Sequence, residues 1–317
     1  MVHKPEWFRD GLVYVSFAPT IGINKDGDEL FVVNLETGTR TSEIDDQIAK
    51  DVDRLVNDDE TTITSRWVPA DAMTERLLAV PVYFDERPLQ ELGRLMMEPD
   101  MAGFSCKTIA ELLADGSLQA MPGHGSPSSD LRTGQIPYIK VSDIRAGQVN
   151  INPANRVSEI IARSFWKGPD SGIRAYDLIT PIRTSKNIGE FAVLMPGQER
   201  MVVTKEVLIL RASDDAVFDN FYLLWAMTLK AVRQQWNSIV FMQTNREDAG
   251  SRYREIHIPI PPTRETAKKF SQPFRDYYMG THRLRDAFLQ YLSADDRHYI
   301  FMSSATVVDD EDLEDAD

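Results

Sequence analysis

Apolar and polar residues alternate in short stretches over most of the chain, and this period of two is typical of β-strands. Residues 12–17 and 30–33 are two such stretches, and the Asp26-Gly27 pair between them is a strong turn signal. The pattern predicts an N-terminal hairpin over residues 11–34. The polar segment from Asn24 to Asp28 contains this pair and has some of the oxygen ligands of a calcium-binding loop. It lacks the remaining ligands, so we expect a simple turn there.

Helical spacing of apolar residues interrupts the strand pattern at a few places. Ser42 is expected to cap a helix with Ile44, Ile48, Val52 and Leu55 on one face. Further helices are expected from Pro88 to Met97, over residues 108–114, and from a cap at Asp219 through Trp236. The expected strands that separate these later helices are residues 136–141, 148–151, 177–182, 191–195, 201–210 and 256–260.

The last long element is a helix expected from about Gln272 to Leu292, with Ser271 as its cap and Pro273 in its first turn. Apolar side chains recur along it at alternating steps of four and three, with Thr281 in the one polar slot. This seam consists of Phe270, Phe274, Tyr277, Leu284, Phe288 and Tyr291. Two heptads are too few for a solitary coiled coil, so the seam is expected to pack on its own domain or on a partner helix.

These elements indicate an α+β protein: a β-rich domain with a long C-terminal helix, preceded by a smaller α/β region. We expect boundaries at residues 1–100, 101–262, 263–300 and 301–317, the first of them near 99–103. The last part ends in a run of acidic residues that cannot be buried, so it is expected to be a disordered tail.

The net charge of −14 is unevenly distributed over the 317 residues. Residues 1–100 hold 10 basic and 21 acidic side chains, whereas residues 101–308 hold 25 basic and 21 acidic ones. The last nine residues add seven acids. The middle of the chain is therefore mildly basic, which permits contact with nucleic-acid phosphates without requiring it.

Signatures of catalysis are missing from the sequence. It has no phosphate-binding Gly-Lys-Ser/Thr loop and no dinucleotide-binding glycine pattern, and Pro127 stands where a nucleophile elbow needs glycine. Ile260 and Thr263 flank Pro261-Pro262 where an adenine methyltransferase needs a side-chain amide or carboxylate and an aromatic residue. One cysteine and five scattered histidines do not make a metal site. We therefore expect no enzyme activity, no cofactor and no metal.

The chain also lacks an apolar run long enough for a membrane helix and an apolar signal core at its start. With a single cysteine, Cys106, these features predict a cytoplasmic protein with no membrane partner.

The order of motifs over residues 105–292 resembles one target-recognition domain of the specificity subunit of Type I restriction-modification systems. The matching segments are Ala114-Asp115-Gly116, residues 134–144, Gly147, residues 175–179, Ile188-Gly189, residues 222–224 and residues 258–262. At Tyr176-Asp177-Leu178 the family usually has Gly-Asp-Ile. The family's subunit carries two recognition domains and two long helices, whereas this chain has one of each, so the resemblance implies a half-subunit.

Residues 11–60 resemble a different protein, the segment that follows the catalytic domain in Type I-like N6-adenine DNA methyltransferases. The similarity lies in residues 13–18, 21–27, 36–38 and 44–46. Together the two resemblances imply a specificity subunit of a restriction-modification or related phage-defence complex. Its implied partners are double-stranded DNA and an N6-adenine methyltransferase subunit, and a second copy of the chain is a further candidate partner.

Two loops, residues 182–189 and 242–248, have the side chains that such recognition needs. Arginine and amide groups read base edges, while lysine and hydroxyl groups hold phosphates. The candidate DNA-binding residues are Arg132, Lys140, Arg145, Arg183, Thr184, Ser185, Lys186, Asn187, Gln243, Thr244, Asn245 and Arg246. The candidate interface residues are Phe274, Tyr277, Leu284, Phe288 and Tyr291. Trp225 and Trp236 are expected in the core. The alternative hypothesis is a non-catalytic structural or inhibitory subunit of a defence complex that no longer reads DNA.

Overall fold

The computed structural model describes residues 11–58, 60–76, 78–125, 134–152, 154–183, 186–243, 246–294 and 297, and seven of these by their backbone alone. Those seven are Asp58, Thr74, Glu75, Arg76, Met242, Gln243 and Arg246. The chain forms two compact units, residues 1–87 and 88–317. The division comes earlier than the boundary expected at 99–103, because Leu92 is buried in the core of the second unit. The acidic end of the chain lies outside the described residues.

The first unit contains two separate antiparallel strand pairs. Strand β1 (Leu12–Ser16) pairs with β4 (Ser65–Pro69), and β2 (Phe31–Val33) pairs with β3 (Arg40–Ile44). The predicted hairpin between β1 and β2 is therefore wrong, although both strands exist. The Asn24–Asp28 segment is a turn, as expected, because the Asn24 side-chain oxygen accepts the backbone N–H groups of Asp26 and Asp28.

Helix α2 (Gln47–Asp58) is attached to the β1–β4 pair by a buried carboxylate. Asp51 accepts hydroxyl groups from Ser16 (2.5 Å) and Thr64 (2.9 Å). The helix begins later than expected, since Asp46 accepts the Ala49 N–H at 2.8 Å and thereby caps it. Ser42, the expected cap, lies in strand β3. Helix α3 (Ala70–Arg76) and a 3-10 turn (Pro81–Phe84) complete the unit.

The second unit is built on a six-stranded sheet with the order β6-β14-β11-β12-β9-β8, in which only β12 and β9 are parallel. Its strands are β6 (Leu118–Pro122), β8 (Ile144–Arg145), β9 (Gln148–Val149), β11 (Leu178–Pro181), β12 (Ala192–Val193) and β14 (Val207–Ala212). A smaller sheet joins β7 (Ile136–Ile139), β10 (Arg156–Val157) and β13 (Val202–Val203). The predicted strand over 201–210 is thus two strands.

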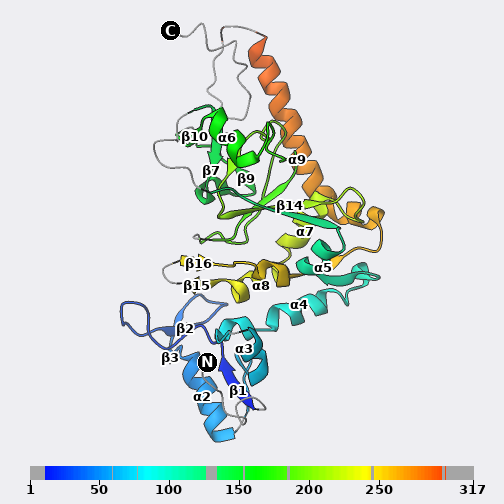
Figure 1. Cartoon of the computed structure of the whole chain (residues 1–317). Helices are drawn as coiled ribbons and strands as arrows, with labels where there is room; N and C mark the ends of the chain where they lie inside the picture. The colour runs from blue at the N-terminus through cyan, green and yellow to red at the C-terminus, as the bar shows by residue number, and fades with distance from the viewer. Residues whose placement is uncertain are drawn as a thin grey trace. The chain divides into compact units, whose positions relative to one another are not determined.

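Both faces of the large sheet are buried, because alternate side chains of its strands enter two different cores. Leu178 and Leu210 pack with helices, whereas Ile179 and Ile209 pack with Ile139 and other residues of the small sheet. The outer face of the small sheet is covered by α6 (Glu159–Trp166), and Figure 1 shows this helix beside β7 and β10. The unit is therefore layered as helices, large sheet, small sheet and helix α6.

Several helices of the second unit begin at side-chain caps, of which the sequence analysis predicts Asp219. Thr108 and Glu111 form a capping box at α5 (Ile109–Ala114), and Asp219 accepts the Tyr222 N–H at 3.0 Å to start α7 (Asn220–Thr228). The expected single helix through Trp236 is two helices, since Leu229 is extended (ψ 132°) and α8 (Lys230–Ile239) follows. Trp236 is buried and Trp225 packs against the core, as predicted.

The remaining elements of the unit include the predicted helix α4 (Arg87–Leu95) and strand β17 (His257–Ile260), which pairs with β5 (Ser105–Thr108). Strands β15 (Phe241–Gln243) and β16 (Arg246–Asp248) form a hairpin, which Figure 1 places beside α8. Short 3-10 turns cover Pro99–Met101, Val141–Asp143 and Arg252–Glu255.

Helix α9 (Arg264–Ser293) is longer than the sequence predicts and begins at Thr263, whose side chain accepts the Thr266 N–H at 3.2 Å. Ser271 is buried inside the helix and is not its cap, and Pro273 also lies within it. Arg264 explains the earlier start, because its guanidinium donates to the carbonyls of Ala216 (2.9 Å) and Asp214 (2.5 Å).

The α9 seam (Phe270, Phe274, Tyr277, Leu284, Phe288 and Tyr291) divides into two parts. Phe270 and Phe274 pack against the core of their own unit. Tyr278, not Tyr277, is the buried tyrosine of the middle turn, and its hydroxyl donates to Gly147 O at 2.9 Å. The other four seam residues are exposed, Leu284 to 76 %. Figure 1 shows the C-terminal half of α9 extending beyond the sheets.

Candidate nucleic-acid interface

The first of the two predicted recognition loops, residues 182–189, follows strand β11 and folds back onto its end. The Gly189 N–H donates to Pro181 O at 3.1 Å, and Ile188 and Gly189 are buried. Gly189 has a left-handed backbone (φ +77°), and a Cβ at this position would lie 2.4 Å from the Trp236 ring. The loop is therefore closed by a glycine that this packing requires. Thr184 and Ser185, between its ends, lie outside the described residues.

The second predicted loop, residues 242–248, lies beside the first, although 65 residues separate their contacting side chains. The Ala249 N–H donates to Ile182 O at 2.9 Å, and Arg183 and Asp248 form an antiparallel bridge. The Arg183 guanidinium also pairs with the Asp248 carboxylate at 2.7 Å. The fold thus brings together the two segments that the sequence singles out. Gln243 and Arg246 are described by backbone alone, and Thr244 and Asn245 lie outside the described residues.

Asn187 connects the first loop to a third segment, the turn over residues 140–145. Its amide nitrogen donates to Ile144 O at 2.9 Å and faces Val141 O at 3.5 Å, inside the protein. An amide committed to buried carbonyls does not reach a base edge. The expectation that Asn187 reads a base is therefore wrong, and its role in this structure is to hold the loop on the turn.

The turn itself is stabilised by Asp143, whose carboxylate accepts the Lys140 N–H at 2.8 Å. Burial raises the pKa of Asp143 despite that hydrogen bond. The Lys140 ammonium, expected at a phosphate, donates to the Asn155 side chain at 2.5 Å and is half-buried. Arg145 is exposed beside the turn, and its guanidinium donates to Ile144 O at 3.1 Å.

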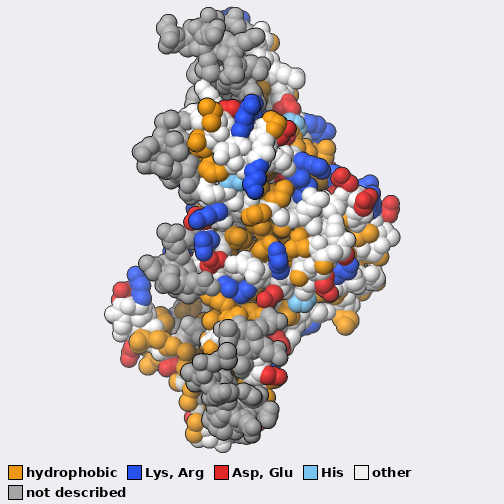
Figure 2. Space-filling view, viewed as in Figure 1, with side chains coloured by type: hydrophobic (Ala, Val, Ile, Leu, Met, Phe, Trp, Pro, Cys, Tyr) orange, Lys and Arg blue, Asp and Glu red, His pale blue; other side chains and the backbone are white. Residues whose placement is uncertain are grey.

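Among the candidate cations, Lys186 and Arg145 are exposed and Arg183 is half-exposed. Arg132 lies outside the described residues. Figure 2 shows Lys and Arg side chains spread over the visible face of the second unit, with acidic side chains among them. This distribution agrees with the mildly basic charge of residues 101–308.

Sequence reasoning missed Asp248 and Asn155 as partners of the candidate cations. Asp248 is the last residue of strand β16, and Asn155 precedes strand β10. Neither has a local signal, because each contacts its cation across a long stretch of chain. A strand register would have been needed to find them.

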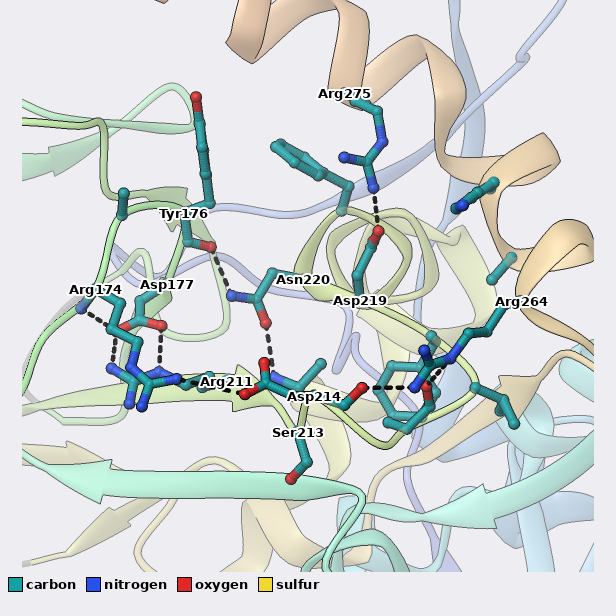
Figure 3. A pocket seen from close by; sticks show the side chains of 18 residues that line it. Arg174, Tyr176, Asp177, Arg211, Ser213, Asp214, Asp219, Asn220, Arg264 and Arg275 are labelled. Carbon is teal, nitrogen blue, oxygen red and sulfur yellow. Dashed lines mark hydrogen bonds and ion pairs between the residues drawn. The ribbon is translucent and has the colours of Figure 1, made fainter.

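A separate cavity of about 390 Å³ lies between β14, the start of α7 and the first half of α9 (Figure 3). Two ion pairs lie in its lining, Arg211 with Asp177 and Arg275 with Asp219. Arg275 also lies over the Phe221 ring, 4.7 Å from its centroid. The contacts of Arg275 therefore attach α9 to the start of α7 beside this cavity.

Tyr176 lines the same cavity with a left-handed backbone (φ +66°), which is costly for a bulky residue. The Tyr176 ring contacts the Phe221 ring at 5.1 Å, and this contact offsets part of the cost.

The described part of the chain contains no cluster of three or more His, Cys, Asp or Glu side chains arranged for a metal ion. Within the same residues, no helix combines the length and the apolar character needed to span a membrane.

Comparisons with known proteins find similarity only at the level of structure. No family model and no curated protein matches the sequence. The chain is similar to the Type I restriction-modification S subunit from M. genitalium at 14 % identity and a TM-score of 0.36, over 61 % of this chain and 41 % of that one.

Two further solved structures are similar to the same degree. One is from work on complex assembly and conformational transition of the type I R-M system (14 % identity, TM-score 0.36, 73 % of this chain and 58 % of that one). The other is the HsdS subunit from Thermoanaerobacter tengcongensis (14 % identity, TM-score 0.35, 74 % and 56 %). The chain thus spans about half the length of the solved chains that it resembles.

Proposed function

We propose that this chain is a non-catalytic DNA-specificity subunit that binds duplex DNA and directs N6-adenine methylation by a partner methyltransferase. The observation that carries the proposal is the meeting of three segments distant in sequence: residues 140–145, 182–189 and 241–249. Arg183–Asp248 and Asn187–Ile144 are the contacts that join them. A DNA reader needs cationic and hydrogen-bonding groups on loops held by a rigid scaffold, and this arrangement supplies them.

The order of motifs over residues 105–292 supports the same proposal, through its resemblance to a Type I target-recognition domain. The two buried sheets make a rigid support for the loops. The net charge of residues 101–308 is small, so the isolated chain is expected to bind DNA weakly and to rely on its partner for further phosphate contacts.

Two surfaces are suited to protein partners. The first unit exposes large apolar side chains, among them Leu35, Val56 and Ile63, within an acidic region. The exposed half of the α9 seam is the other surface. We propose that the first unit faces the methyltransferase and that the α9 seam contacts a partner helix or a second copy.

Replacing Lys186 with alanine should weaken DNA binding by the purified chain about equally for all sequences. Lys186 is exposed and has the flexible point charge that suits a phosphate. Its loss should make the negative slope of log affinity against log salt less steep by about 1. Fluorescence anisotropy with two unrelated duplexes at several salt concentrations measures both effects. Lys25→Ala, an exposed lysine of the first unit, is the matched control. Equal effects of the two variants would contradict a DNA-binding role for the loop.

Replacing Leu284 with aspartate should disrupt assembly without destabilising the isolated chain. The side chain is exposed in the chain alone but would be buried against a partner, where an unpaired carboxylate is costly. Light scattering of complexes purified from the native cells should show loss of a component. Gln290→Asp adds the same charge away from the seam and should assemble normally. Normal assembly of the Leu284 variant would mean that the seam is not an interface.

A further inference from the structure

Arg183 is held in one orientation by a carboxylate that is itself fixed. Its Nε atom donates to Asp248 Oδ2 at 2.7 Å, and its Nη2 atom lies 2.7 Å from the same oxygen in an ion pair. The other oxygen, Oδ1, accepts the Gly250 N–H at 2.5 Å. The Asp248 side chain is 10 % exposed, against 42 % for Arg183, so a nearly buried carboxylate holds an arginine side chain that reaches the surface.

The backbone of Asp248 is fixed as well. Arg252 donates from Nη2 to Asp248 O at 2.6 Å and from Nε to Ile239 O at 2.8 Å. Its guanidinium also lies over the Phe241 ring, 4.2 Å from the centroid, at the base of the β15–β16 hairpin. Arg252 thus clamps both strands and the end of α8, and Asp248 has little freedom to move away from Arg183.

The contact with Asp248 uses one side of the Arg183 guanidinium and leaves its end free. A guanidinium has five N–H donors; the Nε donor bonds to Asp248, and Nη2 faces the same carboxylate oxygen. The two donors of Nη1 and the second donor of Nη2 have no acceptor among the described residues. They form a two-pronged donor fork that is already oriented.

The pairing also determines which acceptor such a fork favours. The charges of Arg183 and Asp248 largely cancel, so the pair attracts a phosphate less than Lys186 does. Its directional N–H donors are retained, and holding them in place lowers the entropy lost on binding. Of the four bases, only guanine presents two neighbouring acceptors, O6 and N7, in the major groove, whereas adenine presents one acceptor and one donor.

We propose that Arg183 reads one guanine of the target site and that Asp248 is the positioning residue that aims it. This inference rests on the proposed function and adds to it the base and the pair of residues that select it. The site is formed by the described residues of strand β16 and of the loop after β11.

The test is to sequence N6-methyladenine in the native cells, with the gene for this chain deleted or carrying Arg183→Lys or Asp248→Asn. Arg183→Lys keeps the charge and removes the fork, and Asp248→Asn keeps the shape but removes the negative charge and one of the two acceptor oxygens that hold Arg183 in place. Both should reduce the preference for guanine at one position of the methylated motif by roughly ten- to a hundred-fold. The base preferences at the other positions of the motif should stay unchanged. Lys186→Ala should lower methylation at every site without changing the motif.

The double variant shows whether Asp248 acts through Arg183. Asp248→Asn should change the guanine preference little further once Arg183 is lysine, whereas a general structural role would add a second loss. Thermal unfolding of the purified variants separates misfolding from lost recognition, and Arg183→Lys, at a half-exposed site, should remain folded.

The outcomes distinguish this inference from the proposed function. An unchanged motif in Arg183→Lys, or complete loss of methylation by that variant while it remains folded, would overturn the guanine assignment alone. A deletion that removes no methylation would overturn the proposed function, and the guanine assignment would fail with it.

Discussion

Replacing Asp177 with alanine should destabilise the second unit by roughly 3–5 kcal/mol, the usual cost of breaking a buried ion pair. The β11–β14 register places Asp177 opposite Arg211. The two carboxylate oxygens accept from Arg211 at 2.7 and 2.5 Å, and both side chains are buried. Alanine would leave the Arg211 charge in the interior with only Gly172 O as a described acceptor.

The melting temperature should fall by about 10 °C, since each kcal/mol corresponds to about 2–4 °C in a unit of this size. Differential scanning calorimetry of the full chain measures the change. Asp214→Ala is the control, because Asp214 is 95 % exposed and lies 3.9 Å from Arg174, so its loss should leave the melting temperature nearly unchanged. Replacing Asp177 and Arg211 together by apolar residues should cost less than Asp177→Ala alone. Equal melting temperatures for Asp177→Ala and Asp214→Ala would contradict this account.

Replacing Gly189 with alanine should destabilise the protein by about 2–5 kcal/mol and also displace the loop that carries Arg183. The left-handed backbone costs a non-glycine residue roughly 1–2 kcal/mol, and overpacking a core adds about 1–3 kcal/mol. Trp236 has no room to withdraw, because it is fully buried and contacts the Phe191 ring edge-on.

Urea unfolding of the full chain measures this loss, and Gly280→Ala is the matched control. Gly280 lies inside α9, and a Cβ added there would have no atom within 4 Å. Alanine at this position should therefore raise the free energy of unfolding by up to about 1 kcal/mol. DNA binding by Gly189→Ala should be weakened even at temperatures where the variant is folded. Unchanged stability would mean that the loop packs differently against α8.

Elements with local signals could be predicted from the sequence. The Thr108–Glu111 capping box and the Asp219 cap depend on side chains within one turn of the helix start, so both are visible in the sequence. The apolar stretches 136–141, 177–182 and 256–260 each contain a strand, because burial on both faces demands continuous apolar character.

Features that depend on distant contacts could not be predicted in this way. Strand β1 pairs with β4 and not with β2, because the contacts of Asp51 with Ser16 and Thr64 bring those two strands together. The sequence places the start of α9 too late, because a proline usually lies in the first turn of a helix. Here the contacts of Arg264 with residues 214 and 216 extend the helix upstream of Pro273.

The sequence predicts the candidate site only in part, because its geometry also depends on contacts between distant residues. Composition identified both polar loops, but it did not distinguish an amide that faces solvent from one that faces the interior, as Asn187 does. The pairing of Arg183 with Asp248 arises from the fold alone.

The central claim is that this chain selects the DNA sequence that a partner methylates. The most direct measurement is single-molecule sequencing of N6-methyladenine in native cells, in the same cells lacking the gene, and in deleted cells complemented with the intact chain. We expect methylation of one short motif to disappear on deletion and to return on complementation, with all other methylation unchanged. An identical methylome in all three would contradict the claim and favour a structural subunit that does not read DNA.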